Sequence, residues 1–278
     1  MNSIIYYIKQ QLNQFYPEKE LMAVIKLLLA ERFGFTDLEL YGCKDRSFSK
    51  IEMDELNDII ERLKCHEPVQ YILGNEYFLG MEFKVTTDVL IPRPETAQLV
   101  QWIEEDYKNK HVSILDIGTG SGCIAISLAS KIKQSQVTAW DISEKAIDIA
   151  LTNSIKNSTK VDFFVKDIFS DSVYNYKYDV IVSNPPYITP TEKTNMDANV
   201  LEWEPSIALF VPQENPLLYY IRIADVGREI LNANGYLYFE INREFGFDTM
   251  NMLKEKGYSN IELRKDIFGN DRMIKAKL

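Results

Sequence analysis

Cysteine and histidine are scarce in this sequence. Its 278 residues include three cysteines, Cys43, Cys65 and Cys123, and two histidines, His66 and His111, with no Cys-x-x-Cys pair. So few and scattered cysteines exclude a disulfide framework and favour a reducing, intracellular compartment. The same scarcity argues against a zinc enzyme or a histidine-based catalytic triad, and we predict no metal site.

Excess positive charge and long apolar runs are also missing. The net charge is -10 and the pI is about 4.9, which argues against stable binding of nucleic acid, since that affinity comes largely from lysine and arginine. An acidic surface instead suits a basic protein partner or a small cationic cofactor. The most apolar run, residues 21–30, is too short to cross a bilayer and contains Lys26. The first residues lack the basic and apolar regions of a signal peptide. We therefore predict an intracellular protein without membrane contact.

The first part of the chain, residues 1–73, is predicted to be a small helical domain. Apolar residues recur there at helical spacing and no strand pattern is visible. One helix begins near Pro17 and runs to about Phe33, where Gly34 ends it. The other two predicted helices have these apolar faces: Ile4, Ile5, Ile8, Leu12 and Phe15 in the first, and Ile51, Leu56, Ile59, Ile60 and Leu63 in the last, over 49–65.

The rest of the chain changes in pattern. Residues 74–92 predict a β-hairpin linker turning at Gly80, and residues 93–278 alternate strands with helices. Repeated βα units predict a doubly wound, mostly parallel sheet, an α/β fold, with the last two strands forming an antiparallel edge hairpin. The predicted strands are 112–118, 136–142, 161–167, 178–187, 235–242, 261–267 and 272–278, and the helices between them are 122–132, 143–155, 216–231 and 247–257.

A glycine-rich turn, "ILDIGTGSG" over 114–122, follows the first of these strands. Glycine permits a tight turn and close approach of a ligand to the backbone. The spacing G-x-G-x-G differs from the dinucleotide fingerprint, and no Gly-Lys-Ser/Thr follows, which excludes a phosphate-binding P-loop. Asp116 at the strand tip is expected to face the ligand crevice, where it suits an ammonium group better than a pyrophosphate.

Two further acidic residues end the next two strands. Asp141 is placed to accept hydrogen bonds from both hydroxyls of a ribose. Its alternative role is to cap the following helix, which Ser143 can equally fill. Asp167 can accept from an adenine amino group while Ile168 packs on the base.

A nucleoside, a ribose diol and no phosphate grip together indicate S-adenosylmethionine, with S-adenosylhomocysteine as product. At these residues the chain resembles class I methyltransferases, which implies a Rossmann-like sheet. The predicted cofactor-binding residues are Asp116, Gly118, Thr119, Gly120, Gly122, Asp141, Ile142, Asp167, Ile168 and Asn184.

The fourth strand ends in "NPPY", Asn184 to Tyr187, at the mouth of the same crevice. Proline fixes φ and holds the preceding residue extended. The Asn184 side-chain oxygen and the Pro185 carbonyl then offer two acceptors for the two hydrogens of a planar –NH2, and Tyr187 offers a ring for stacking or a cation–π contact. The alternative is a turn that merely stops the strand. A clamp of this kind fits either the exocyclic amine of a nucleobase or the side-chain amide of glutamine.

Longer segments narrow the choice. Residues 68–96, with "YILG" and "IPRPET", residues 202–210, "EWEPSIALF", and the ending "DIFGNDRMIKAKL" resemble the release-factor glutamine methyltransferases of the PrmC/HemK family. The resemblance implies methyl transfer from S-adenosylmethionine to the N5 amide of the glutamine in the Gly-Gly-Gln motif of class 1 peptide chain release factors. It implies that these factors are the partner and that the enzyme is cytoplasmic. We also predict a monomer.

The resemblance also assigns site residues. Asn184, Pro185, Pro186 and Tyr187 are predicted as catalytic and substrate-binding, joined by Arg93 and Glu95, with Pro94 and Thr96 nearby. An equally weighted alternative makes Pro94 the first helical residue and Glu95 a favourable first-turn acid. We expect Glu204-Pro205 to pack near the clamp in a structural role.

Some positions depart from the family pattern. Ala97 stands where a glutamate is expected, Asn242 and Phe245 replace a glycine and a glutamine, and Glu214-Asn215 replaces Asp-Gly. The alternative function is an adenine-N6 or other exocyclic-amine nucleic-acid methyltransferase, but a recognition insert rich in lysine and arginine is missing after Asp167. A cofactor-binding scaffold without catalysis has no need for an intact Asn184.

Overall fold

A computed structural model describes residues 3–41, 46–170 and 176–278, except the side chain of Asn195; Cys43 lies outside these residues. The chain divides into two compact units. One contains Met1–Asn75 together with Asp197–Trp203, and the other contains Glu76–Met196 and Glu204–Leu278. In the described part of the chain, none of the helices combines the length and apolar character needed to cross a membrane.

The first unit is helical. Its described helices are α1 (Ser3–Leu12), α2 (Glu18–Phe33), α3 (Asp37–Tyr41), α4 (Lys50–Lys64), α5 (Val69–Leu73) and α9 (Ala198–Trp203). The three predicted helices are confirmed, but Phe15 follows the end of α1 and is exposed, and Ile51 is 79% exposed. Both predicted core positions are wrong. Phe15 and Ile51 lie at helix ends, where the apolar face no longer packs against the other helices.

Local signals explain where two of these helices begin and end. α2 ends at Gly34, whose φ of 65° is the left-handed conformation that glycine adopts without strain. α4 begins with a capping box, because Ser49 Oγ accepts from the Glu52 amide at 3.2 Å while Glu52 accepts from the Ser49 amide at 2.8 Å.

The predicted hairpin consists of β1 (Asn75–Phe78) and β2 (Met81–Lys84). Leu79 and Gly80 form its two-residue turn, with φ of 51° and 79°. A positive φ at both positions is what a type I′ hairpin turn requires. The buried Asn153 side chain accepts from the Lys84 amide at 2.6 Å and donates to the Ser121 carbonyl at 2.8 Å. It therefore ties the hairpin to the glycine-rich turn.

The larger unit is built on a seven-stranded sheet of order β5-β4-β3-β6-β7-β9-β8. β3 to β7 are parallel, while β9 is antiparallel to both β7 and β8, so the predicted edge hairpin is confirmed. The strands are β3 (Val112–Ile117), β4 (Ser135–Asp141), β5 (Val161–Val165), β6 (Tyr178–Ser183), β7 (Leu231–Glu240), β8 (Ser259–Lys265) and β9 (Asp271–Lys277).

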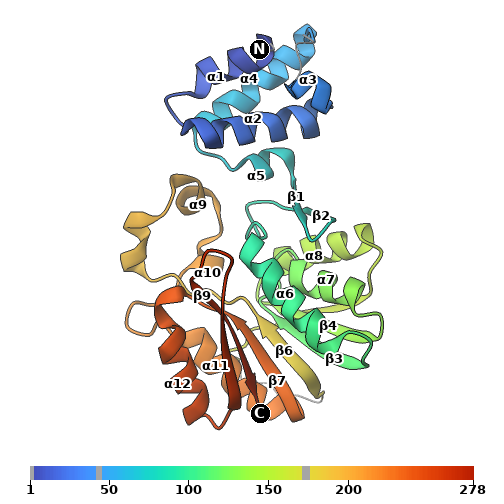
Figure 1. Cartoon of the computed structure of the whole chain (residues 1–278), viewed down its shortest axis with the longest axis vertical. Coiled ribbons are helices and arrows are strands. Elements are labelled where there is room, and N and C mark those ends of the chain that lie inside the picture. Colours follow the sequence, from blue (N-terminus) through green and yellow to red (C-terminus); the bar gives the residue numbers. More distant parts are fainter. Residues whose placement is uncertain (1–2, 42–45, 171–175) are drawn as a thin grey trace. The chain divides into compact units, whose positions relative to one another are not determined.

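Helices cover both faces of this sheet (Figure 1). The helices of this unit are α6 (Pro94–Tyr107), α7 (Cys123–Lys131), α8 (Glu144–Lys156), η1 (Pro190–Asn195), α10 (Ser206–Leu209), α11 (Leu218–Ile230), η2 (Arg243–Phe245) and α12 (Gly246–Glu255). Because side chains alternate along a strand, Ile114 faces one core with α6 and α7, whereas Leu115 faces the other with α11 and α12.

We predict that two substitutions on α4 differ sharply in their effect on stability. Leu56 is fully buried, so Leu56→Ala should lower the free energy of unfolding by about 2–5 kcal/mol. Ile51→Ala should change it by less than about 0.5 kcal/mol because that side chain is already in water. Urea unfolding of both variants measures the difference, and equal losses would contradict the assignment of the helix face.

Candidate active site

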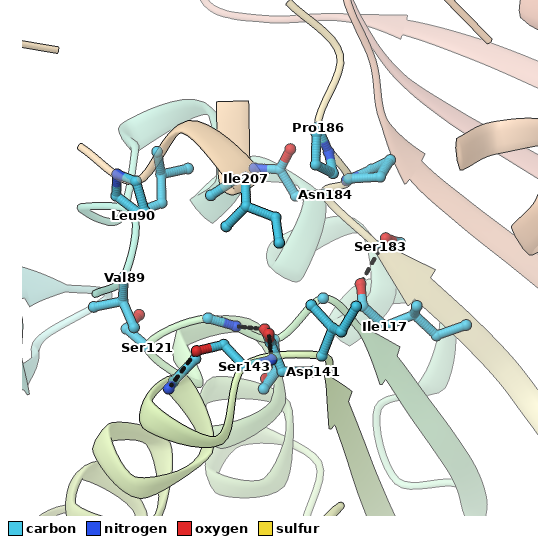
Figure 2. Close-up of a pocket in the computed structure, with 18 of the residues that line it drawn as sticks. Val89, Leu90, Ile117, Ser121, Asp141, Ser143, Ser183, Asn184, Pro186 and Ile207 are labelled. Carbon is cyan, nitrogen blue, oxygen red and sulfur yellow. Dashed lines mark hydrogen bonds between the residues drawn. The ribbon is translucent and has the colours of Figure 1, made fainter. Parts of the chain in front are cut away.

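A pocket opens at the carboxyl ends of the parallel strands, where open α/β sheets bind their ligands. Its empty space is about 1130 Å³, which includes a part that is open to solvent. The loops after β3, β4, β5 and β6 form its walls. Figure 2 shows Ile207 and Asn184 across the opening from Asp141.

The glycine-rich turn forms one wall. The amides of Gly118 and Thr119 both donate to the Trp140 carbonyl, at 2.8 and 3.0 Å. Gly118 and Gly120 have φ of 74° and 54°, and a Cβ added at either would meet no atom within 4 Å. The wall therefore presents bare backbone to the pocket, which is the surface that an adenosyl cofactor's close approach requires.

Gly122 has a role besides the one predicted. It does not line the pocket. A Cβ there would lie 2.8 Å from Ile126 Cδ1 and 3.1 Å from Ala150 Cβ. Glycine at this position is therefore needed for the packing of α7 against α8, while the direct cofactor contact of Gly122 stays a prediction.

Asp116 also departs from the prediction. Its side chain is fully buried and does not line the pocket, so it does not face the ligand crevice. Its Oδ2 accepts from Thr119 Oγ1 at 2.6 Å and from the Ala125 amide at 3.2 Å. Burial raises the pKa of the Asp116 carboxyl to about 7. Asp116 thus holds the glycine-rich turn against the start of α7 from within the core.

Asp141 and Asp167 do reach the pocket. Asp141 accepts from the Gly120 amide at 2.8 Å and from the Ser143 amide at 2.9 Å (Figure 2). The helix cap is Ser143, which accepts from the Ala146 amide at 3.2 Å, so the alternative capping role of Asp141 is wrong. A carboxylate has about four lone-pair sites, so Asp141 can still accept from a ligand hydroxyl. Exposed Asp167 is followed by buried Ile168, and both line the pocket.

The clamp segment follows β6. Ser183 Oγ donates to the Ile117 carbonyl at 2.6 Å and joins the ends of two neighbouring strands (Figure 2). Asn184, Pro185 and Pro186 then line the pocket, as predicted from the sequence. Tyr187 does not line it. Its ring packs against the α11 side of the core, and its hydroxyl donates to Glu240 Oε1 at 3.2 Å. The stacking role expected for Tyr187 is therefore not the one the structure shows.

Glu240, at the end of β7, is a buried residue whose connection to the clamp the sequence did not indicate. It is 1% exposed, and its Oε2 accepts from Thr96 Oγ1 at 2.6 Å. Thr96 Oγ1 in turn accepts from Asn184 Nδ2 at 3.3 Å. Burial raises the pKa of the Glu240 carboxyl, whereas the Thr96 hydrogen bond and the Arg272 charge lower it.

Asn242, one of the departures from the expected pattern, supports the same segment from the other side. Its Nδ2 donates to the Tyr187 carbonyl at 3.1 Å and to Glu192 Oε1 at 2.9 Å. Glu192 accepts from the Thr189 amide at 2.8 Å. The chain that follows the clamp is thus fixed by a side chain that a glycine cannot supply.

Arg93 and Glu95 separate in the structure. Arg93 lines the pocket and forms an ion pair at 2.5 Å with Glu204, which is buried and also accepts from the Ile91 amide at 3.3 Å. Glu95 does not line the pocket. Pro94 is the first residue of α6 and Glu95 lies in its first turn, so the alternative helix-start reading holds for this pair.

Other pocket residues carried no recognisable signal in the sequence. They come from loops and from the starts of α10 and α11, among them Val89, Leu90, Ser121, Phe169, Ile207 and Tyr219. Ser121, Phe169 and Ile207 lie next to predicted site residues along the chain, which is the one hint of their position.

Comparisons with known proteins give a consistent result. The family model "Methyltransferase small domain" matches residues 94–202, and "PrmC N-terminal domain" matches residues 4–74. A release factor glutamine methyltransferase from Bacteroides thetaiotaomicron is 48% identical over 277 residues, covering 99% of both chains. One from Flavobacterium psychrophilum is 42% identical, covering 96% of this chain and 95% of its own.

The chain belongs to the release factor glutamine methyltransferase family. The resemblance noted in the sequence is therefore confirmed, and the chain is a methyltransferase. A crystal structure of a methyltransferase from Pyrococcus furiosus superposes with a TM-score of 0.51 at 18% identity, covering 82% of this chain and 98% of that one. That likeness shows the shared fold.

The remaining departures from the family pattern lie outside the pocket wall. Ala97 is partly buried against the core beneath α6 and α7. Phe245 is half-buried at the end of η2, and its amide donates to the Asn242 carbonyl at 3.1 Å. Neither residue lines the pocket.

We predict that alanine at two glycines of the turn has separable effects. Gly118→Ala should weaken binding of S-adenosylhomocysteine and cost about 1–2 kcal/mol of stability from its positive φ. Gly122→Ala should cost more, about 2–4 kcal/mol, because its Cβ also overpacks Ile126 and Ala150. Calorimetric titration and urea unfolding measure the two effects. Equal stability losses would contradict the packing role of Gly122.

Asp116 should make stability depend on pH. Between its ordinary pKa of 3.8 and the folded-state value of about 7, the folded chain keeps a proton that the unfolded chain releases. Stability should therefore fall as pH rises through this window, by about 4 kcal/mol in total from this group. Asp116→Asn should remove that part of the slope. Urea unfolding from pH 4 to pH 8 measures it, and identical slopes in the two proteins would refute the assignment.

Proposed function

We propose that this enzyme transfers a methyl group from S-adenosylmethionine to the N5 side-chain amide of the glutamine in the Gly-Gly-Gln motif of class 1 peptide chain release factors. The observation that carries the proposal is the position of Asn184 and Pro185 on the wall of the pocket that also contains Asp141 and the bare glycine turn. Family membership supports the same substrate.

The pocket residues fit S-adenosylmethionine. Gly118 and Gly120 leave backbone exposed where any Cβ would project into open space. Asp141 keeps lone pairs for the ribose hydroxyls, and Asp167 lies beside Ile168 for the adenine. Ile142 is 51% exposed and lines the same wall, so it offers apolar surface for the base. The cofactor supplies an electrophilic methyl group on a sulfonium.

The clamp offers two acceptors without internal partners. Among the described residues, no hydrogen bond uses Asn184 Oδ1 or the Pro185 carbonyl. Pro185 and Pro186 restrict the backbone on either side of that carbonyl, so its direction is set before substrate arrives. Two fixed acceptors match the two N–H groups of a primary amide.

An amide nitrogen is a poor nucleophile because its lone pair is delocalised. Accepting both N–H groups favours the pyramidal nitrogen that develops positive charge in the transition state. With S-adenosylmethionine held by the glycine turn, Asp141 and Asp167, the cofactor would supply the methyl group that the nitrogen lone pair accepts, and its sulfur would keep the bonding electrons. One amide proton then leaves to water. Holding the partners in line supplies proximity, worth roughly 7–11 kcal/mol.

The helical unit is proposed as the docking surface for the release factor. The net charge of -10 complements a basic, ribosome-binding partner and speeds encounter. The enzyme is proposed to act as a cytoplasmic monomer, since its substrate is a translation factor.

Asn184→Ala should lower kcat by about 10²–10³-fold because one of the two acceptors for the amide is lost. Binding of S-adenosylhomocysteine should remain largely intact. A methyl-transfer assay with labelled cofactor and a release factor measures the first quantity, and calorimetry measures the second. Turnover at the wild-type rate would rule out the clamp.

Substrate identity is tested in the same assay. We expect transfer to the release factor, none to its variant with alanine in place of the Gly-Gly-Gln glutamine, and none to DNA. Transfer to DNA in preference to the release factor would overturn the proposed function and favour an exocyclic base amine.

A further inference from the structure

A chain of three side chains runs from the core to the clamp. Asn184 Nδ2 donates to Thr96 Oγ1 at 3.3 Å, and Thr96 Oγ1 donates to Glu240 Oε2 at 2.6 Å. Thr96 is 2% exposed and Glu240 is 1% exposed, so water does not compete for either group. The chain comes from three separate elements: the loop after β6, the first turn of α6 and the end of β7.

The chemistry of these groups gives the chain a direction. A threonine hydroxyl has one hydrogen to donate, whereas a carboxylate only accepts. The hydroxyl hydrogen of Thr96 is therefore committed to Glu240, and Thr96 can only accept from Asn184. Asn184 must then turn its –NH2 toward Thr96, which leaves Oδ1 as the end of the amide that is free.

Hydrogen-bond donors surround Glu240 on its side chain and on its backbone. Tyr187 donates to its other oxygen at 3.2 Å, and Tyr220 donates to its backbone carbonyl at 3.4 Å. Burial raises the pKa of the Glu240 carboxyl, and the nearby Glu95 adds to this, whereas the hydroxyls of Thr96 and Tyr187 and the positive charge of Arg272, from β9, lower the pKa and favour the ionised form. The hydroxyls of Thr96 and Tyr187 thus donate to the carboxylate, and the Arg272 guanidinium stabilises its charge. The same carboxylate anchors Tyr187 of the clamp.

We propose that Thr96 and Glu240 are positioning residues that fix which end of the Asn184 amide faces the substrate. This inference rests on the proposed function, because it explains why the clamp presents a hydrogen-bond acceptor to the substrate amide. We call the hydrogen-bonded series of Asn184, Thr96 and Glu240 the relay. With the relay intact, Asn184 presents its side-chain oxygen to a substrate group that carries two hydrogens. With the relay broken, the amide can turn, and its –NH2 meets the –NH2 of the substrate. Thr96 and Glu240 therefore favour a substrate group that donates hydrogens, and they do so through Asn184.

The first test replaces Thr96 by valine, which keeps its shape, and by serine, which keeps its hydroxyl. Thr96→Val keeps the shape and removes the hydroxyl, and should lower kcat by about 10–100-fold with little change in KM for S-adenosylmethionine. Thr96→Ser keeps the hydroxyl and should restore most of the lost rate. If Thr96 serves packing alone, the order reverses, with valine benign and serine costly, and that result overturns the proposal.

A matched control separates rate from stability. Thr249 is also fully buried, and its hydroxyl donates to the Phe245 carbonyl at 2.7 Å on α12. Thr249→Val removes a comparable hydrogen bond and should lower the melting temperature about as much as Thr96→Val while leaving kcat far closer to wild type. Equal loss of kcat in both variants would assign the effect to general destabilisation and overturn the relay.

Glu240→Gln tests the other end. Glutamine can donate to Thr96 and so frees its hydroxyl to donate to Asn184 Oδ1, which reverses the chain. We expect a loss of kcat like that of Thr96→Val in a protein whose circular dichroism is unchanged. A Glu240→Gln enzyme with the wild-type kcat would remove Glu240 from the relay.

A second readout needs no methyl transfer and stays valid if the substrate is another molecule. The side-chain ¹⁵N–H resonances of Asn184, assigned by their absence in Asn184→Ala, should be protected from solvent exchange in the wild type and in Thr96→Ser. They should lose that protection in Thr96→Val. Protection that persists in Thr96→Val overturns the relay, whereas loss of protection in an enzyme that does not methylate release factors would refute only the proposed function.

Discussion

One buried carboxylate, that of Glu240, holds the clamp together. It accepts from Thr96 at 2.6 Å and from Tyr187 at 3.2 Å, and through Thr96 it sets the direction of the Asn184 amide. A buried charge is costly unless donors surround it, and here two hydroxyls and the charge of Arg272 do so. The Asn184 side chain is consequently oriented before any substrate binds. A weak nucleophile such as an amide nitrogen needs this, because much of the rate then comes from correct positioning.

The parallel sheet explains why groups so far apart in the chain meet. Strands β3, β4, β5 and β6 all run the same way, so the residues that follow them gather at one edge. This geometry made much of the site predictable. The glycines of the turn, Asp141, Asp167 and Asn184 all lie at or just after the end of a recognisable strand. All of them line the pocket except Gly122. The strand and helix pattern was readable for the same reason, since buried strands between amphipathic helices have distinct periodicities.

What the sequence did not reveal depends on contacts between distant residues. Thr96 and Glu240 are 144 positions apart, and Arg93 and Glu204 are 111 apart, so neither pair leaves a local pattern. Asp116 and Gly122 belong to the motif that marks the site, yet they serve the core beneath it. A strand-end residue and its neighbour point to opposite faces; the motif alone does not say which of them reaches the ligand.

The central claim is that two fixed acceptors at Asn184 and Pro185 present a primary amide to the methyl group. Tandem mass spectrometry of a release factor incubated with the enzyme and S-adenosylmethionine tests it most directly, because it locates the methyl group on one residue. The account predicts a single methyl group on the side chain of the Gly-Gly-Gln glutamine. A methyl group on any other residue, or none on a release factor that carries this motif, would contradict it.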